Sequence, residues 1–375
     1  MPFVSTHEPG AHGTLGHAWA GSAWQAEGRR HFAIVSRDLA DGTAAPRAMA
    51  MSFFAHGFVP DPNAPARVAV FEKHGPGAAI VGLDTLTPER ALDCGATREF
   101  YGHGAFTRDG ALLFATEIVK DDTRSGTLGI YDGTTGARIG ELPSGGVAPH
   151  DCVLVDDGAV LVVGHGGGAL GQPDPPCVCW LELPSGKLLR KLVLDDPRFD
   201  VGHLALGDRG DLAIVSAPRH GTIAPERSRG GLTLVPRDRP QHSVDHRDGE
   251  SEHRRESVAA MIGETLSVAL HEPTRTVATT NPEGHLLAFW DLDDGSLRAR
   301  LRVPNPRGVA LTLDGNEFVV SFGIHGKLAR VDARTCKPVD VPGNRDGVRC
   351  GATGSHLFVY DVAADAGAIG IELPG

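Results

Sequence analysis

A repeating β-strand unit constrains this sequence more than any other feature. One complete copy runs from His103 to His150, and each of these histidines stands just before a short apolar stretch. Between them lie β-rich stretches with period-2 alternation, separated by turn pairs such as Asp109-Gly110. This alternation of strands and tight turns is typical of a four-stranded antiparallel unit. The same unit can be followed forwards and backwards along the chain.

Seven such units can be aligned by the strand that opens each of them. Their first residues follow one another at intervals of 39 to 64 residues: His56, His103, His150, His203, Ser267, Gly308 and Gly347. Most of these intervals are near the period of roughly 40–50 residues that is typical of β-propeller blades. We therefore predict an all-β fold, a seven-bladed β-propeller that spans residues 1–375 as a single domain.

The two ends of the chain suggest how this ring closes. Little sequence follows Gly347, whereas three strand-like stretches precede His56, at Ala18–Gln25, His31–Ser36 and Arg47–Phe53. We expect these N-terminal strands to complete the last blade, because closure removes exposed sheet edges. The strongly polar stretch 237–255 does not fit the repeat and is predicted to be a solvated loop insertion. Its histidines are His242, His246 and His253.

Charge and hydropathy exclude several classes of partner. The 375 residues include 36 Lys and Arg against 47 Asp and Glu, which gives a net charge of −11. A protein that binds nucleic acids or anionic membranes needs concentrated positive charge on its surface, so neither is an expected partner of this acidic chain. No apolar run approaches the roughly 18 residues of a membrane-spanning helix. The start of the sequence lacks the basic-then-apolar order of a signal peptide, and this predicts a cytoplasmic protein.

The six cysteines show no paired CxxC spacing, so neither a zinc ribbon nor a thioredoxin motif is expected. Cys177 and Cys179 are separated by one residue and so lie on the same face of a predicted strand. We interpret them as buried free thiols.

Four of the seven openings carry a histidine at the same position of the repeat. The start of the innermost strand of a propeller blade faces the central channel, so these histidines should form an arc at one height around the axis. They are His56, His103, His150 and His203. Neutral imidazole is a common ligand for copper, iron, nickel and zinc. A set of nitrogen ligands without thiolates favours copper or iron over a structural zinc ion, so we predict a copper or iron site.

Hairpin pairing predicts a second layer around this arc. A turn at Asp157-Gly158 places His150 opposite His165, and a turn at Asp109-Gly110 places His103 opposite Thr116, next to Glu117. We predict that His165 and Glu117 act as catalytic groups, either as an extra ligand, as a base or by orienting the imidazoles.

These residues predict a metal-dependent enzyme, of the oxidase or oxygenase type, that acts on a small-molecule substrate in the open half of the channel. Two alternatives stay open. The histidines can simply line a wet tunnel, or the propeller can be a non-catalytic scaffold that binds a protein partner, a metal or a small ligand.

Several segments together resemble a bacterial propeller family, the domain of unknown function 1513: Glu99–Gly104, Ala115–Glu117, Gly126–Asp132, Pro143–Gly146 and Pro149–Asp151. The likeness runs from about His56 to Asp361 and implies the propeller fold and its histidines, while the activity of the family is unassigned. Members commonly look exported, and their Thr-Glu pair tends to precede Asn-Asp, where this chain has Ile118-Val119. The predicted axial site is also similar in one respect to three groups of propeller enzymes, which place a histidine-bound metal on or near the ring axis. They are nitrous oxide reductases, carotenoid cleavage oxygenases and copper-dependent methanethiol oxidases.

Overall fold

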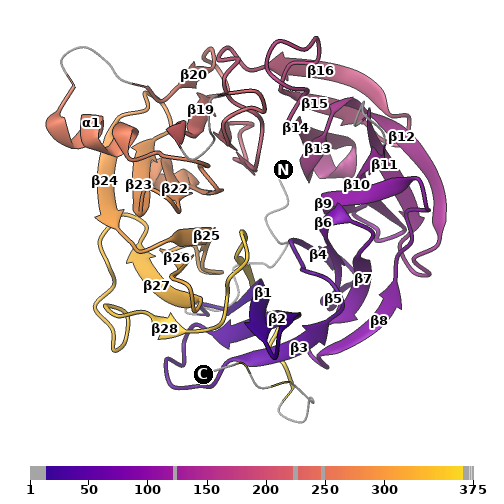
Figure 1. Ribbon diagram of the computed structural model, residues 1–375, viewed down its shortest axis with the longest axis horizontal. Coiled ribbons are helices and arrows are strands. Elements are labelled where there is room, and N and C mark those ends of the chain that lie inside the picture. The colour runs from indigo at the N-terminus through magenta and orange to yellow at the C-terminus, as the bar shows by residue number, and fades with distance from the viewer. Residues whose placement is uncertain are drawn as a thin grey trace.

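The protein is a ring of seven antiparallel β-sheets around a central axis (Figure 1). The computed structural model describes residues 14–120, 125–222, 227–245, 250–365, 371 and 373. The predicted all-β, seven-bladed propeller is confirmed. Each blade is named below by its innermost strand.

Six blades follow one another along the chain. From the axis outward, the first blade consists of β4 (Gly57–Asp61), β5 (Ala64–Phe71), β7 (Ala78–Gly82) and β8 (Thr87–Ala91). The second consists of β9 (Arg98–Phe106), β10 (Leu112–Val119), β11 (Ser125–Asp132) and β12 (Arg138–Val147). The third consists of β13 (Pro149–Val155), β14 (Val160–His165), β15 (Cys177–Glu182) and β16 (Lys187–Val193). The fourth blade consists of β17 (Leu204–Leu206), β18 (Leu212–Ser216), β19 (Gly231–Val235) and β20 (His242–Ser243). The fifth consists of β21 (Ser267–His271), β22 (Thr276–Asn281), β23 (Leu286–Asp291) and β24 (Leu297–Arg302). The sixth consists of β25 (Pro306–Leu311), β26 (Glu317–Phe322), β27 (Lys327–Asp332) and β28 (Val348–Arg349).

The seventh blade joins the two ends of the chain. Its innermost strand, β29 (Phe358–Tyr360), comes from the C-terminal end, and its outer strands come from the N-terminal end: β1 (His17–Ala26), β2 (Arg29–Asp38) and β3 (Arg47–Met51). The predicted closure by N-terminal strands is therefore consistent with the structure. The predicted opening at Gly347 is wrong, because it leads into β28, the outermost strand of the β25 blade.

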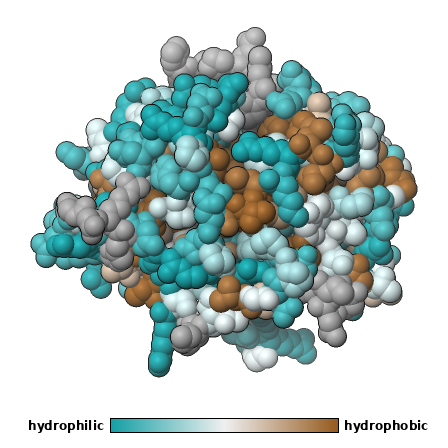
Figure 2. Space-filling view, turned by 90° about the horizontal axis from the view of Figure 1, so that it is seen from above, coloured by the Kyte–Doolittle hydropathy of each residue, from teal (hydrophilic) through white to brown (hydrophobic). Residues whose placement is uncertain are grey.

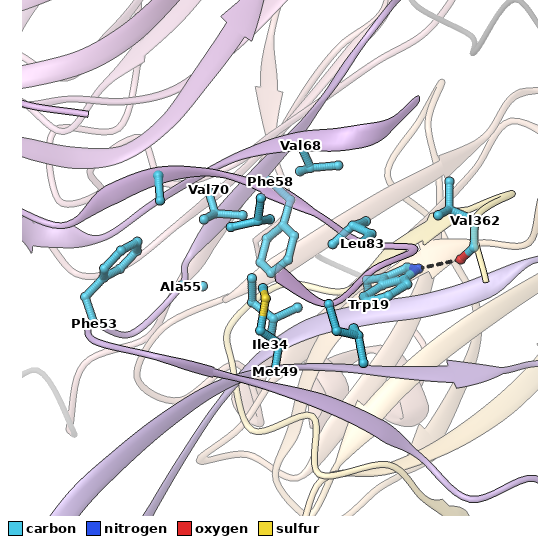
Figure 3. Packing of buried hydrophobic residues seen from close by; sticks show 13 residues of the cluster. Trp19, Ile34, Met49, Phe53, Ala55, Phe58, Val68, Val70, Leu83 and Val362 are labelled. Atoms are coloured by element: carbon cyan, nitrogen blue, oxygen red, sulfur yellow. Dashed lines mark hydrogen bonds between the residues drawn. The ribbon is translucent and has the colours of Figure 1, made fainter. Parts of the chain in front are cut away.

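The interface that closes the ring is apolar. Trp19 of β1 is fully buried and packs against residues of the β4 blade, among them Phe58 and Val68 (Figure 3). Its indole Nε1 donates a hydrogen bond to the carbonyl oxygen of Val362, 3.1 Å away, beyond the end of β29 (Figure 3). Both ends of the chain thus contribute to one core, which fastens the ring.

Two irregular features shape the ring further. Strand β6 (Lys73–Gly75) lies between β5 and β7 in the sequence, but it pairs with β9 of the next blade. Lys73 is therefore beside Tyr101 at the inner edge of the β9 blade. Two single 3-10 turns, η1 (Asp156–Gly158) and η3 (Glu272–Thr274), replace simple hairpin turns.

The polar stretch 237–255 is only partly a loop. It contains the short outer strand β20, and helix α1 (Glu252–Ala259) begins inside it, with the hydroxyl of Ser251 accepting a hydrogen bond from the Arg254 amide. The Arg254 guanidinium is buried and donates to the carbonyl oxygen of Asp245, which ties the helix to the blade. His246 lies outside the described residues.

Hydrophilic side chains cover most of the side of the ring seen in Figure 2, and hydrophobic ones gather there in separate patches. In the described part of the chain, no helix is long and apolar enough to cross a lipid bilayer.

Candidate metal centre at the ring axis

Five histidines, one from the innermost part of each of five blades, meet at the axis of the ring. They include all four members of the predicted arc, and the fifth, His356, stands just before β29. All five side chains are at most 9% exposed: His56, His103, His150, His203 and His356. In nine of their ten pairs, the ring centroids are 4.0 to 5.7 Å apart.

His356 was missed because the repeat was aligned on Gly347. The segment His356-Leu357-Phe358-Val359 has the same pattern as His56-Gly57-Phe58-Val59, and it opens the seventh blade. Of the seven unit openings aligned in the sequence, Ser267 and Gly308 are then the two that carry a small residue in place of a histidine. The arc of four histidines is in fact a cluster of five.

The hydrogen bonds of His150 and His203 fix the state of both rings. The Nδ1 atom of His150 lies 2.7 Å from the carbonyl oxygen of Tyr101, and that of His203 lies 2.6 Å from the carbonyl oxygen of Leu266. A carbonyl oxygen can only accept, so both Nδ1 atoms carry a proton and both neutral rings have a lone pair at Nε2. These two Nε2 atoms face each other at 2.9 Å.

His103 is oriented by a carboxylate. Its Nδ1 lies 3.4 Å from Oδ1 of Asp151, whose Oδ2 accepts a 2.8 Å hydrogen bond from the amide of Leu204. The Nε2 of His103 is buried and has no hydrogen-bond partner among the described residues. A carboxyl group beside one nitrogen and a free second nitrogen are the arrangement that metal-binding histidines commonly have.

His56 and His356 complete the cluster from the two sides of the ring closure. Their Nε2 atoms are 3.1 Å apart. One nitrogen from each of His56, His103, His203 and His356 can be chosen so that all four lie within 4.8 Å of one another. Such a set needs only a small contraction to reach Zn–N-like bond lengths of about 2.0–2.1 Å around one ion.

Burial keeps these imidazoles neutral. Desolvation lowers the pKa of His203 to about 3 and holds the pKa of each of the other four histidines well below its usual value. The positive charge of Lys73 adds to the lowering of the pKa. A neutral imidazole is the form that binds a metal ion.

A cavity of about 740 Å³ lies along the axis and reaches the histidines. His103, His203 and His356 line it together with Asp151, and its remaining wall is largely apolar, with side chains that include Phe58, Val153, Leu204, Val268, Val309 and Phe358. The cluster is thus open to a pocket that suits a small molecule with an apolar body.

Glu117 takes no part in this cluster. Its side chain is fully buried and accepts a 2.6 Å hydrogen bond from the Tyr131 hydroxyl. It also pairs with Arg138 at 3.0 Å and with Arg98 at 3.6 Å. The β9–β10 register shifts between Ala115 and Glu117, and the side chain directed towards the histidines is Thr116, whose hydroxyl bonds to the backbone of His103.

His165 also lies apart from the axial histidines. The β13–β14 register shifts between Pro149 and Cys152, so that Pro149, and not His150, is opposite His165. Its cross-strand partner Cys177 packs with Ala105 and Phe114 of the β9 blade, so His165 lies on the face of its sheet that is turned to that blade. It lies instead with Cys177 and Cys179, and one ligand atom from each of the three falls within 4.8 Å of the others.

Comparison with known proteins places the chain in a family. Residues 49–346 match the family described as "Protein of unknown function (DUF1513)", and this segment contains four of the five axial histidines. No curated protein matches the sequence. Among solved structures, hydrazine synthase of Kuenenia stuttgartiensis is similar, with a TM-score of 0.62 and 11% identity over 82% of this chain and 92% of that one. At this identity the likeness concerns the fold alone. The chain belongs to the DUF1513 family, and its structure is that of a seven-bladed propeller with a histidine cluster on the axis.

Proposed function

We propose that this protein is a metal-dependent redox enzyme whose axial histidines hold one copper or iron ion. The observation that carries the proposal is the pair of Nε2 atoms of His150 and His203, 2.9 Å apart, each with its Nδ1 proton committed to a carbonyl oxygen. Two lone pairs at this distance repel unless a cation lies at or beside them. A proton is disfavoured there, because burial lowers the pKa of both rings. A metal ion can accept both Nε2 lone pairs.

The nature of the donors supports copper or iron. The cluster offers up to five imidazole nitrogens and no thiolate, and imidazole suits copper, iron, nickel and zinc alike. Structural zinc sites are closed and often rich in cysteine, whereas this cluster opens on a cavity. Hydrazine synthase, an enzyme, has a similar fold, which is compatible with catalysis on such a ring.

The surrounding residues have definable tasks in such an enzyme. Asp151, Tyr101 and Leu266 orient His103, His150 and His203 through their Nδ1 atoms, which leaves the Nε2 atoms available to a metal ion. The apolar wall of the cavity excludes water and holds a small organic substrate against the cluster. A bound copper or iron ion would supply one-electron chemistry with oxygen as the oxidant.

Elemental analysis of the full chain, purified without a chelating tag, tests this proposal. We expect close to one copper or iron ion per chain in the wild type, and strongly reduced content in His150→Ala and His203→Ala. His325→Ala, an exposed histidine in the turn between β26 and β27, is the matched control and should keep the metal.

Two outcomes would overturn the proposal. Absence of transition metal, even after reconstitution with Cu(I), Cu(II) and Fe(II), would leave the histidines as the lining of the channel. Stoichiometric metal without oxygen consumption in the presence of any small apolar substrate tested would favour a metal-binding protein that is not an enzyme.

A further inference from the structure

A second group of potential metal ligands lies inside the β13 blade, away from the axis. It consists of His165 at the end of β14 and of Cys177 and Cys179 on the neighbouring strand β15. His165 and Cys177 are direct cross-strand partners, so their side chains lie on the same face. Cys179 follows two residues later on that face, and the two sulfur atoms are 3.9 Å apart. All three side chains are fully buried.

His165 is the unusual member of this group. Neither of its ring nitrogens has a hydrogen-bond partner among the described residues, although the side chain is 0% exposed. Buried polar atoms in folded proteins are nearly always paired, since an unpaired one loses its hydration without compensation. A donor and an acceptor left unpaired on the same ring, beside two thiols, point to a ligand that bonds to nitrogen and sulfur.

The spacing of the two cysteines suits a shared ion better than a disulfide bond. Residues two apart on a strand have Cα atoms about 6.6 Å apart, because the rise is about 3.3 Å per residue. This is at the far end of the range of roughly 4.4–6.8 Å that disulfides span. Joining the sulfurs would therefore distort β15, whereas a metal ion can bridge them where they are.

The neighbouring blade leaves room for this group. Gly145 and Gly146 of β12 lie directly against it. A β-carbon on Gly146 would lie 2.7 Å from the His165 ring and 3.1 Å from the Cys177 sulfur, and one on Gly145 would lie 3.0 Å from the Cys179 sulfur. Only glycines fit here without displacing the three side chains.

A positive charge lies beside this group. The ammonium group of Lys191 donates a 3.0 Å hydrogen bond to the carbonyl oxygen of Gly145, and the Cys179 thiol donates one of 3.5 Å to the same oxygen. A thiolate is the form of cysteine that binds metals.

We propose that His165, Cys177 and Cys179 form a second metal site, selective for monovalent copper. Thiolates are soft ligands that select Cu(I) and zinc, and zinc in structural sites takes four ligands. The described residues supply three such donors here, two sulfurs and one nitrogen, in a closed apolar interior. A three-ligand set without access to water suits Cu(I). This site is independent of the proposed axial centre, with which it shares no residue.

Anaerobic titration of the full chain with Cu(I) against a chromophoric Cu(I) chelator tests the proposal. To remove the axial ligands, the titration is made in a variant with all five axial histidines replaced by alanine: His56, His103, His150, His203 and His356. We expect one tightly held Cu(I) per chain, with copper–sulfur scattering in the X-ray absorption spectrum. Adding Cys177→Ser or Cys179→Ser should abolish this binding. Adding Cys94→Ser, another buried cysteine outside the β13 blade, should leave it unchanged.

If a variant fails to fold, the X-ray absorption spectrum of the copper-loaded wild type still tests the proposal. Copper–sulfur scattering in the wild type supports the site, and scattering from nitrogen alone contradicts it. Retention of Cu(I) in a folded Cys177→Ser variant would also overturn the proposal. Equally tight binding of Zn(II) with sulfur ligands would overturn the assignment to copper.

Discussion

The Nε2 atom of His356 lies 3.1 Å from the Nε2 atom of His56, although 300 residues separate them in the sequence. His56 opens the first complete blade, and His356 opens the blade that unites the two ends of the chain. Closure of the ring is therefore what assembles this part of the cluster. The stability of the ring and metal binding at the axial site should therefore depend on one another.

We predict that His356→Ala lowers the affinity for the axial metal as much as loss of a ligand from the predicted arc does. Even residues that only orient a metal ligand are typically worth 10–100-fold in affinity, and His356 contributes a nitrogen directly to the four-histidine set. The metal content and dissociation constant of His356→Ala, compared with those of His325→Ala, check this. Unchanged affinity in the His356 variant would remove it from the ligand set.

The repeat in the sequence predicted the fold and most of the site, and its failure at one blade has a physical cause. Gly347-Val348-Arg349-Cys350 has the apolar pattern of an opening strand, but so do outer strands of the same blades. Nothing in the local pattern of β28 distinguishes the outermost position from the innermost. Only the ring closure shows that β29, with three residues, is the inner strand.

The second-layer residues were misplaced for a different reason. Counting outward from Asp157-Gly158 assumes an unbroken ladder, whereas the bulge between Pro149 and Cys152 shifts the pairing by one residue. A shift of one residue moves a side chain to the opposite face of the sheet. His165 therefore lies opposite Pro149 and not opposite His150. At Ala115–Glu117 the pairing shifts by two residues, and Glu117 lies with Tyr131 and Arg138 rather than beside His103. Bulges of this kind carry no sequence pattern that the repeat reveals.

Asp151 gives a prediction about orientation. In Asp151→Asn, the contact that positions Nδ1 of His103 is weakened, and the amide can present either its oxygen or its nitrogen to the ring. We expect the affinity for the axial metal to fall by about 10–100-fold while the fold persists. Asp157→Asn, an exposed carboxylate in the turn of the same blade, is the control. Equal affinities in the two variants would mean that Asp151 does not position His103.

The role of Glu117 can be separated from catalysis. It is the buried one of two carboxylates that Arg98 and Arg138 share, the other being the exposed Glu141, so Glu117→Gln leaves both guanidinium groups with the exposed partner alone. Because both arginines are partly exposed, we expect a loss of about 2–3 kcal/mol in the free energy of unfolding, below that of a fully buried pair. Metal content should not change. Urea unfolding and elemental analysis check this, with Glu89→Gln, an exposed carboxylate that pairs with Arg67 in another blade, as the control. Loss of metal would instead return Glu117 to the site.

Ring closure can be tested at Trp19. Replacement by phenylalanine removes the hydrogen bond to Val362 and leaves a space among the apolar residues between the first and last strands. We expect a destabilisation of about 1–3 kcal/mol, measured by urea unfolding. Trp24→Phe, near the other end of the same strand, alters a partly exposed indole and should cost less than about 1 kcal/mol. Similar losses in both variants would show that the closure interface is not a special point of stability.

The last prediction concerns pH and the protein freed of metal. The pKa of each axial histidine is lowered in the folded state, so the unfolded chain binds more protons below its ordinary pKa of about 6.5. Stability should therefore fall as the pH decreases below that value, by up to about 1.4 kcal/mol per histidine and pH unit. Asp151 and Asp200 act in the opposite direction, since burial raises the pKa of each to about 7.

Burial also raises the pKa of Glu117 and Glu264, but the five histidines should outweigh these four carboxyl groups, so the net effect of acid should be destabilising. Urea unfolding of the metal-free protein at about pH 7.5 and about pH 5 measures it, with His150→Asn, His203→Asn as the comparison. In that variant two of the five titrating groups are gone, and the dependence on pH should become shallower. A wild-type stability that rises on acidification would show that the carboxyl groups dominate and that the histidines are not held neutral by burial.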